Sequence, residues 1–250
     1  MTVKYLGRFS ENKLRYLWPG SKPFTAISLF SGCGGAALGV MQAGFDVRVF
    51  VEIDKYACQT LRRNWTDDLG KRTVPKKYRK WQGIPAIIQE DITKVSTSQI
   101  LKAAKLRVGE VSLLEGGFPC QGFSTASTKR DKNNYKKDKR NFLYLECVRV
   151  IREALPKTFF LENVPGLVSM ENGRVIRMII DDLSKCGYTI NWDILNAANY
   201  GVPQNRKRVF ILGKRVDLME LNGKKVICHI GAVKGGVTHP AWFLKKYDRK

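Results

Sequence analysis

Short apolar runs alternate along this chain with stretches whose apolar residues recur at helical spacing. The runs lie at residues 26–30, 45–53, 84–92, 110–118, 158–164 and 207–213, and each has the length of a strand. Helical spacing is found at 34–44, 143–155 and 173–187, and the last of these stretches ends at a glycine. Strands that alternate with helices predict βαβ units. We therefore expect a doubly wound α/β domain with a largely parallel sheet and helices on both faces.

This regular pattern ends near residue 215. Two earlier stretches interrupt it, namely 66–83, which is rich in Lys, Pro and Gly, and the basic segment that follows Cys120. Residues 216–250 show no continuation of the sheet pattern. We expect one folded domain over residues 1–215, followed by a C-terminal extension over 216–250.

Composition narrows the class of protein. No apolar run reaches the roughly 18 residues of a membrane span, and the polar start MTVKYLGRFS lacks the apolar core of a secretory signal, so we expect a cytoplasmic protein. Six cysteines without a C-x-x-C pair, together with two histidines, suggest neither a zinc site nor a disulfide framework, and we expect no metal. The formal net charge of +22 favours a polyanionic partner such as nucleic acid.

A glycine turn, SLFSGCGGAALG, follows the first predicted strand and opens a helix. Gly32 and Gly34 would let a ligand approach backbone amides, while Glu52 at the end of the second strand could accept hydrogen bonds from both ribose hydroxyls. Asp91 ends the third strand at the same edge and could accept from an adenine amino group. The three strand ends predict an adenosine-containing cofactor. These features do not distinguish NAD from S-adenosylmethionine (AdoMet).

The fourth strand end carries a cysteine in an unusual setting, the tract GGFPCQGFS. Cys120 lies between a proline and a glutamine, where a thiol that only filled a core would not be expected. It would lie at the carboxyl edge of the sheet, where ligands bind in this architecture, and a cysteine attacks only as its thiolate. We therefore interpret Cys120 as a candidate nucleophile.

Later segments bring further charged residues to the same edge. Glu162 ends the fifth strand in FFLENVPG, and a carboxyl beside apolar residues suits a group that must hold or donate a proton. In PQNRKRVFILG, Arg206 and Arg208 alternate with neighbours and would point to one face of an extended chain. Two guanidinium groups on one face suit a phosphate or a base carbonyl.

In this order the motifs resemble those of the C5-cytosine-specific DNA methyltransferases. The resemblance runs from SLFSGCGG through VEIDKYACQTLRRNW, QEDI, GGFPCQGFS, DKRNFLYLECVRVI and FLENVPGL to LNAANYGVPQNRKRVFILG, roughly residues 25–213. The combination of PCQ, ENV and Q-x-R-x-R carries most of its specificity. It implies a Rossmann-like AdoMet-binding catalytic domain over residues 1–215 that acts on double-stranded DNA, as in a restriction-modification system.

The resemblance also implies a role for each matching residue. Cys120 would add to C6 of a cytosine swung out of the duplex, and Glu162 would hold the ring at N3 and the amino group. Arg206 and Arg208 would position the base oxygen, the phosphate backbone and the cysteine loop. From its charge and its position after Cys120, we expect the basic segment 129–140 to close over the flipped nucleotide and contact phosphates. The residues that would bind AdoMet are Phe30, Gly32, Gly34, Glu52, Ile53 and Asp91, with Phe30 and Ile53 packing on the adenine.

The sequence departs from the family pattern after residue 213. Family members continue with a target-recognition domain, an arginine-containing motif and a Gly-Asn motif, and residues 214–250 match none of these. The departure favours a catalytic subunit of a split enzyme whose companion subunit supplies recognition. A truncated or degenerate copy is the other explanation. In either case we expect little sequence-specific activity from the chain alone.

Three other functions fit parts of the sequence. A tRNA cytosine-5 methyltransferase shares PCQ and ENV, but that subgroup usually follows PCQ with Pro-Phe-Thr, whereas Gly-Phe-Ser stands here. A catalytically inactive DNA- or AdoMet-binding module would not require the intact set of Cys120, Glu162, Arg206 and Arg208. A NAD dehydrogenase would leave the same set without a role.

Overall fold

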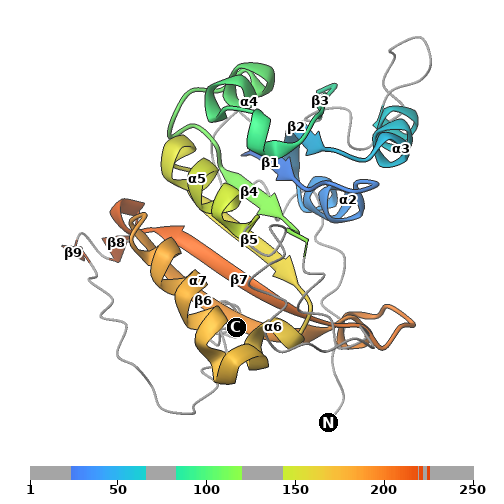
Figure 1. Cartoon of the computed structure of the whole chain (residues 1–250). Coiled ribbons are helices and arrows are strands. Elements are labelled where there is room, and N and C mark those ends of the chain that lie inside the picture. Colours follow the sequence, from blue (N-terminus) through green and yellow to red (C-terminus); the bar gives the residue numbers. More distant parts are fainter. Residues whose placement is uncertain (1–23, 66–82, 120–142, 219, 222–223, 226–250) are drawn as a thin grey trace, which may run out of the picture.

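The computed structural model describes residues 24–65, 83–119 and 143–218 and two short strands at 220–221 and 224–225. Cys120, the basic segment 129–140 and most of the predicted C-terminal extension lie outside the described residues. The described part is a sheet covered by helices on both faces (Figure 1). The predicted α/β class and the Rossmann-like arrangement are confirmed.

Seven strands form the sheet, in the order β3-β2-β1-β4-β5-β7-β6. Strand β7 is antiparallel to both of its neighbours, and the other strands run parallel to one another, so the sheet is largely parallel as predicted. The strands are β1 Phe24–Leu29, β2 Phe45–Glu52, β3 Ala86–Gln89, β4 Leu113–Gly116, β5 Thr158–Asn163, β6 Tyr188–Asn196 and β7 Lys207–Arg215; β8 Glu220–Leu221 and β9 Lys224–Lys225 pair separately.

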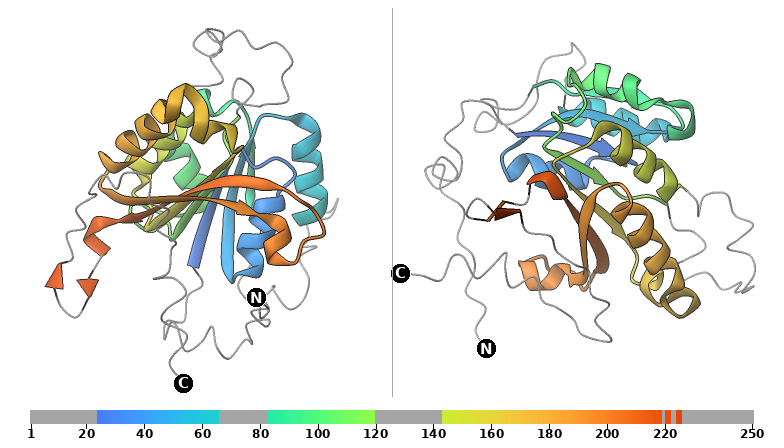
Figure 2. Two further views of the ribbon diagram at one scale, coloured as in Figure 1. Left: turned by 90° about the horizontal axis from the view of Figure 1, so that it is seen from below. Right: turned by 90° about the vertical axis from the view of Figure 1, so that its left-hand side faces the viewer.

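The helices divide into two layers (Figure 2). On one face the cores of α4, α5 and α7 pack on residues such as Ile27, Leu114 and Ile211. On the other face α2 and α3 pack on Ala26, Phe50 and neighbouring residues. The helices are α2 Gly35–Gln42, α3 Lys55–Trp65, α4 Thr97–Ala104, α5 Tyr144–Ala154, α6 Gly166–Ser169 and α7 Arg174–Ser184, with short 3₁₀ turns at Ile92–Lys94, Met170–Gly173, Ala197–Tyr200 and Val216–Leu218.

Local sequence explains where helices begin. Helix α4 starts with a capping box, in which the Ser96 hydroxyl accepts from the Gln99 amide at 3.2 Å and the Gln99 side chain accepts from the Ser96 amide at 2.8 Å. Helix α2 starts at Gly34, whose φ of 84° lies in the left-handed region that favours glycine. These starts orient the loops that leave the carboxyl ends of the strands.

The strand register aligns those carboxyl ends along one edge. Leu29 of β1 lies opposite Val51 of β2 and Gly116 of β4, and Gly116 lies opposite Leu161 of β5. Glu52 lies opposite Gln89 of β3. The segments that follow these residues therefore leave the sheet side by side. This edge contains the predicted site residues that the structure describes.

None of the helices in the described ranges is long and apolar enough to cross a membrane.

Candidate active site

The turn after β1 is built from residues with positive φ. Phe30 and Gly32 have φ values of 52° and 51°, and Gly34 has a φ of 84°. A Cβ atom on Gly34 would lie 2.7 Å from Leu61 Cδ2, so glycine lets the turn pack closely on α3. A Cβ on Gly32 would meet no heavy atom within 4 Å, which leaves open space in front of the turn. The turn thus leaves the backbone of Gly32 open to the approach of a ligand.

Glu52 ties this turn to the end of β2. One carboxylate oxygen accepts from the Gly32 amide at 2.7 Å, and the other accepts from the Asp54 amide at 2.8 Å. Ser31 adds a second link, because its amide and its hydroxyl both bond to the Val51 carbonyl. A carboxylate oxygen can accept more than one hydrogen bond, so Glu52 keeps acceptor capacity for a ribose.

Ile53 follows Glu52 at the end of β2, and Asp91 lies at the end of β3. The Ile53 residue is 64% exposed, which leaves an apolar surface beside Glu52. Asp91 Oδ1 accepts from both the amide and the hydroxyl of Thr93, each at 2.9 Å, and these bonds hold the Asp91 pKa below its usual value. Asp91 thus caps the 3₁₀ turn after β3, and the described bonds engage only one of its oxygens.

Arg149 of α5, which was not predicted as a site residue, fixes the loop that carries Asp91. Its guanidinium donates to the carbonyl oxygens of Ile92 and Val95 at 3.1 and 2.9 Å and to the Thr97 hydroxyl at 3.0 Å. Glu146 on the same helix accepts from it at 2.8 Å. An arginine among apolar helix positions was the available signal, but its target lies more than fifty residues away in the chain.

Glu162 meets both predicted arginines. Its Oε1 lies 2.9 Å from Arg208 Nε and 3.7 Å from Arg206 Nη2, and its side chain is 30% exposed. A Cβ atom on Gly117 would lie 3.5 Å from Glu162 Oε2, so this oxygen lies beside the Gly117 backbone. Both arginines therefore bind one oxygen, and the other oxygen points over the backbone that leads to Cys120.

Asn163 anchors that backbone. Its buried amide group donates to the Phe118 carbonyl at 3.1 Å, and its Oδ1 accepts from the Val164 amide at 2.8 Å. Phe118 stands two residues before Cys120, so β5 holds the start of the cysteine loop. Asn163 belongs to the ENV motif but was assigned no role from the sequence, although an asparagine at a strand end is a frequent backbone partner.

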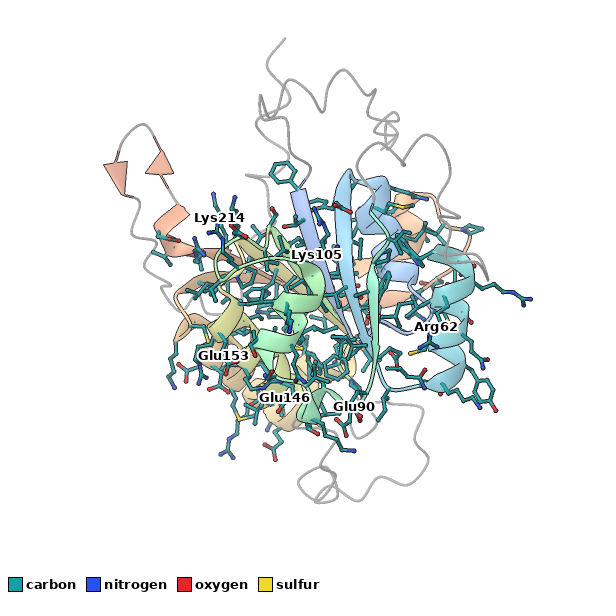
Figure 3. The ribbon with its side chains drawn as sticks, turned by 90° about the horizontal axis from the view of Figure 1, so that it is seen from above. Arg62, Glu90, Lys105, Glu146, Glu153 and Lys214 are labelled. Carbon is teal, nitrogen blue, oxygen red and sulfur yellow. The ribbon has the colours of Figure 1, made fainter. Side chains whose placement is uncertain are left out.

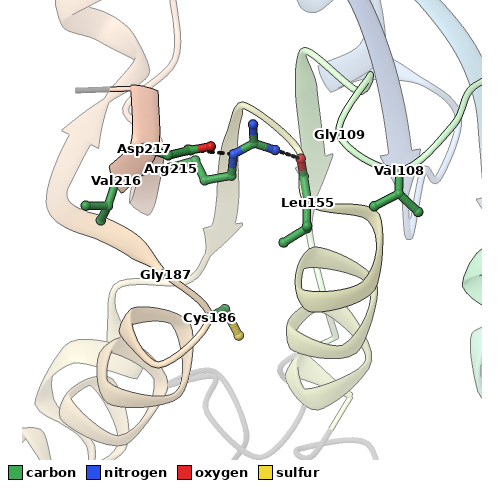
Figure 4. Close-up of a pocket in the computed structure, with 8 residues that line it drawn as sticks. All are labelled: Val108, Gly109, Leu155, Cys186, Gly187, Arg215, Val216 and Asp217. Carbon is green, nitrogen blue, oxygen red and sulfur yellow. Dashed lines mark hydrogen bonds and ion pairs between the residues drawn. The ribbon is translucent and has the colours of Figure 1, made fainter. Parts of the chain in front are cut away.

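A separate hollow of about 530 Å³ lies at the opposite edge of the sheet (Figure 4). It lies beside the loop before β4 and the end of β7, where Arg215 bonds to the Leu155 carbonyl at 2.5 Å and to Asp217 at 2.7 Å. The hollow contains none of the predicted site residues. The candidate active site is therefore the carboxyl edge.

The matched family agrees with this placement. A family model described as C-5 cytosine-specific DNA methylase matches residues 24–231. The chain belongs to this family. The match spans the glycine turn, Glu52, Asp91, Glu162 and both arginines, and it also includes Cys120.

Individual relatives within this family differ in length. The chain is 40% identical over 198 residues to the type II methyltransferase M.AquIA of Picosynechococcus sp., which covers 76% of this chain and 71% of that protein. It is 38% identical over 201 residues to M.PspPI of Psychrobacter sp., but this covers 80% of the chain and only 42% of that relative. The chain thus spans less than half the length of M.PspPI.

Solved structures share the fold. A structure described as a DNA modification methyltransferase encoded within an E. coli prophage superposes with a TM-score of 0.60 at 31% identity, covering 78% of this chain and 47% of that one. Spodoptera frugiperda DNMT2 superposes with a TM-score of 0.54 at 21% identity, covering 78% and 51%, and this likeness shows the fold alone. The roles of the individual site residues stay predictions.

Proposed function

We propose that this chain is the catalytic part of a DNA (cytosine-5) methyltransferase that transfers a methyl group from AdoMet to C5 of a flipped cytosine. The observation that carries the proposal is the contact of Glu162 with Arg206 and Arg208 beside the backbone leading to Cys120. Membership of the C-5 cytosine-specific DNA methylase family supports the substrate class. Neither a dehydrogenase nor a simple binding module requires this arrangement.

The residues at the ends of β1 to β3 fit AdoMet. The open space in front of Gly32 accommodates the ligand's approach to the backbone, and Glu52 offers acceptor capacity for the ribose. The exposed Ile53 offers an apolar contact for adenine, and one oxygen of Asp91 is left for its amino group. When bound, AdoMet supplies the methyl group from its sulfonium.

The protein side chains would make the cytosine reactive. The Cys120 thiolate forms a bond to C6 while Glu162, hydrogen-bonded at N3 and the amino group, stabilises the proton that balances the added charge. The electron pair thus reaches C5, which takes the methyl group. Loss of the C5 proton then breaks the C6–S bond, releases the thiolate and restores the ring. One proton is released for each methyl group transferred.

Arg206 and Arg208 would keep Glu162 in place and favour anionic groups in the site. Two guanidinium groups on one carboxylate oxygen fix its orientation, which leaves the other oxygen for the base.

Most of the basic charge available for phosphate contacts lies outside the described residues. Residues 24–65, 83–119 and 143–218 contain nineteen Lys or Arg and fifteen Asp or Glu, a net charge of +4 out of +22. Residues 129–140, which follow Cys120, contain seven Lys or Arg and two Asp, a net charge of +5.

We further propose that a companion subunit supplies sequence recognition. On the α2 side of the sheet, the β5 and β7 region exposes apolar side chains: Leu212 is 46% exposed, and Phe160 and Phe210 have ring centroids 6.1 Å apart. Among the described helices, only α2 and α3 belong to the apolar cluster on this side of the sheet. They pack on β1 and β2, not on β5 and β7. An exposed apolar surface of this kind suits a protein partner.

Trapping with 5-fluorocytosine tests the covalent step. Fluorine takes the place of the C5 proton and cannot leave as a cation, so the C6–S bond persists after methyl transfer. A long duplex of mixed sequence with 5-fluorocytosine at every cytosine removes the need to know the target. We expect an AdoMet-dependent adduct on a denaturing gel when the chain is mixed with the product of the adjacent reading frame, and little adduct from the chain alone.

The control is Cys120→Ala, which should form no adduct while still binding AdoMet. Absence of any adduct with wild-type chain and companion would refute the enzymatic proposal. Transfer of labelled methyl to tRNA, with none to DNA, would instead favour the tRNA methyltransferase alternative. Robust methylation of one defined site by the chain alone would refute the need for a companion.

A further inference from the structure

Arg149 joins helix α5 to the loop that follows β3. Its Nη2 donates to the carbonyl oxygens of Ile92 and Val95, its Nη1 donates to the Thr97 hydroxyl, and its Nε donates to Glu146. The side chain is 28% exposed, and the three loop residues that accept from it are buried. A planar guanidinium presents five N–H donors in fixed directions, which an ammonium group does not reproduce. This set of contacts therefore favours arginine over lysine.

The loop that carries Asp91 is held at its two ends by other contacts. Backbone pairing with β2 continues as far as Glu90, whose amide donates to the Glu52 carbonyl at 3.1 Å. At the far end, the capping box of Ser96 and Gln99 fixes the start of α4. The guanidinium of α5 binds the stretch between these two ends. It therefore determines how the middle of the loop lies against α5.

Two acids on α5 balance the charge of Arg149 (Figure 3). Glu146 accepts from the guanidinium at 2.8 Å, and Glu153 Oε2 lies 3.7 Å from Arg149 Nη1. They stand three residues before and four residues after the arginine, so all three side chains share one face of the helix. Because the charge is balanced on its own helix, no anionic ligand is needed to explain this arginine. Its contacts with the loop are hydrogen bonds to neutral groups.

Asp91 lies one residue before Ile92, the first carbonyl that Arg149 binds. One oxygen of Asp91 accepts from Thr93, and the described bonds leave the other oxygen for a ligand. We propose that Arg149 is a positioning residue for recognition of the nucleobase, because it holds the loop where the second Asp91 oxygen accepts from the adenine amino group. The inference rests on the proposed function, since it takes an adenosine cofactor as the ligand of Asp91. It assigns the selectivity for that amino group to a residue of α5 that acts through the loop.

Such selectivity depends closely on position. An ionised carboxylate only accepts hydrogen bonds, so an amino group at its oxygen is favourable, whereas a carbonyl oxygen at the same place is not. A hydrogen bond to a charged group corresponds to a preference of about 10- to 100-fold. The bond is lost when the two atoms are more than about 3.5 Å apart, so a shift of the loop by about 1 Å would remove most of the preference.

Two ligands that differ only at this group test the inference. S-adenosylhomocysteine has the amino group, and S-inosylhomocysteine has an oxygen in its place. By calorimetry on the full chain, we expect wild type to prefer the adenosyl ligand about 10- to 100-fold. Arg149→Met, which keeps an unbranched side chain without its donors, should lower this preference to about threefold or less, mainly by weakening the adenosyl ligand. The matched control is Arg152→Met on the exposed face of the same helix, which should keep the wild-type preference.

The ratio of the two affinities separates positioning from a general loss of structure, which would weaken both ligands alike. Asp91→Ala removes the accepting oxygens, and adding Arg149→Met to it should not lower the ratio further, because the two residues act through one contact. If Arg149→Met fails to fold, Thr97→Val takes its place. This variant removes one acceptor of the guanidinium and should lower the preference about threefold.

A wild-type ratio in Arg149→Met, or in Thr97→Val where the first variant does not fold, would overturn the inference. A further fall in the double variant would do the same, since Arg149 would then act other than through Asp91. Equal binding of the two ligands by wild type would show that Asp91 does not recognise the amino group, which also contradicts the inference. Failure of wild type to bind S-adenosylhomocysteine at all would instead count against the proposed function, which the 5-fluorocytosine adduct tests independently.

Discussion

The two halves of the carboxyl edge are built by different means. At the ends of β1 to β3, backbone conformation forms the candidate cofactor site: Phe30, Gly32 and Gly34 have positive φ, and Glu52 accepts from two backbone amides. At the ends of β5 and β7, side-chain charges form the candidate base site. There a single carboxylate meets two arginines that stand more than forty residues later in the chain.

The difference predicts how each half responds to mutation. Changes to the backbone-built half alter φ or packing, and so they should lower stability and cofactor affinity together. Changes to the charge-built half leave the packing of the sheet intact, and so they should lower the rate of methyl transfer with little effect on folding. Measurements of stability, AdoMet affinity and methylation rate on single variants can therefore test this division.

The largest effect is expected at Glu162. Glu162→Gln keeps the shape of the side chain but removes the charge that binds the arginines and stabilises the proton on the base. Groups that transfer or stabilise a proton typically contribute 10²- to 10⁴-fold, so we expect the methylation rate to fall by about that factor. Single-turnover assays with the companion present would measure it.

The same variant should bind AdoMet as wild type does and should keep its Tm within a few degrees. A large loss of AdoMet affinity in Glu162→Gln would mean that the two halves are not separate. That result would place Glu162 in the cofactor site instead.

The two arginines provide a graded comparison within the charge-built half. Arg208 lies 2.9 Å from Glu162 and its side chain is 24% exposed, whereas Arg206 lies at 3.7 Å and is 48% exposed. Loss of a hydrogen bond to a charged group costs about 1.5–3 kcal/mol, so Arg208→Ala should slow methylation about 10- to 100-fold. Arg206→Ala should cost about 1 kcal/mol or less through the loss of its ion pair with Glu162. Equal losses in the two variants would show that phosphate or base contacts, rather than Glu162, dominate.

The sequence predicted most of the fold because apolar periodicity is a local signal. Six of the seven sheet strands and helices α2, α5 and α7 coincide with predicted runs. Strand β6 was missed, since an edge strand with several exposed positions, such as Trp192 and Ile194, lacks a continuous apolar run. The antiparallel direction of β7 was not predicted either, because direction depends on how a connection crosses the sheet and not on the composition of the strand.

Prediction of the candidate site depended on what each residue contacts. The spacing of Arg206 and Arg208 gave a common face for two side chains, and the structure places both on Glu162. Arg149 and Asn163 were missed because they bond to backbone carbonyls in loops that lie far from them in the sequence. Such contacts leave no pattern along the chain. The position of Cys120 relative to Glu162 lies outside the described residues and stays a prediction.

The backbone-built half should be most sensitive at Gly34. An alanine there would place Cβ 2.7 Å from Leu61 Cδ2 at a φ of 84°, so we expect a loss of about 1–3 kcal/mol in the free energy of unfolding. Gly35→Ala is the matched control, because its Cβ would meet nothing within 4 Å at the start of α2. Urea denaturation would compare the two. If Gly35→Ala were as harmful as Gly34→Ala, the close approach to α3 would not explain the glycine.

The smallest effect is expected at Asp91, where stability and ligand binding can be separated. Asp91→Ala removes the cap on the 3₁₀ turn and should cost about 1 kcal/mol or less, whereas Asp91→Asn retains a capping oxygen and should preserve most of this stability. Because the folded-state pKa of Asp91 is lowered, its contribution is present above the ordinary value of 3.8 and is lost as the pH falls below it. Asn has only one side-chain oxygen. If that oxygen caps the turn, the NH₂ group takes the place of the other oxygen, and it cannot accept a hydrogen bond from the adenine amino group. Weakened AdoMet binding with a wild-type Tm in Asp91→Asn would therefore show that Asp91 both caps the turn and binds the cofactor. Wild-type AdoMet affinity would show that it only caps the turn.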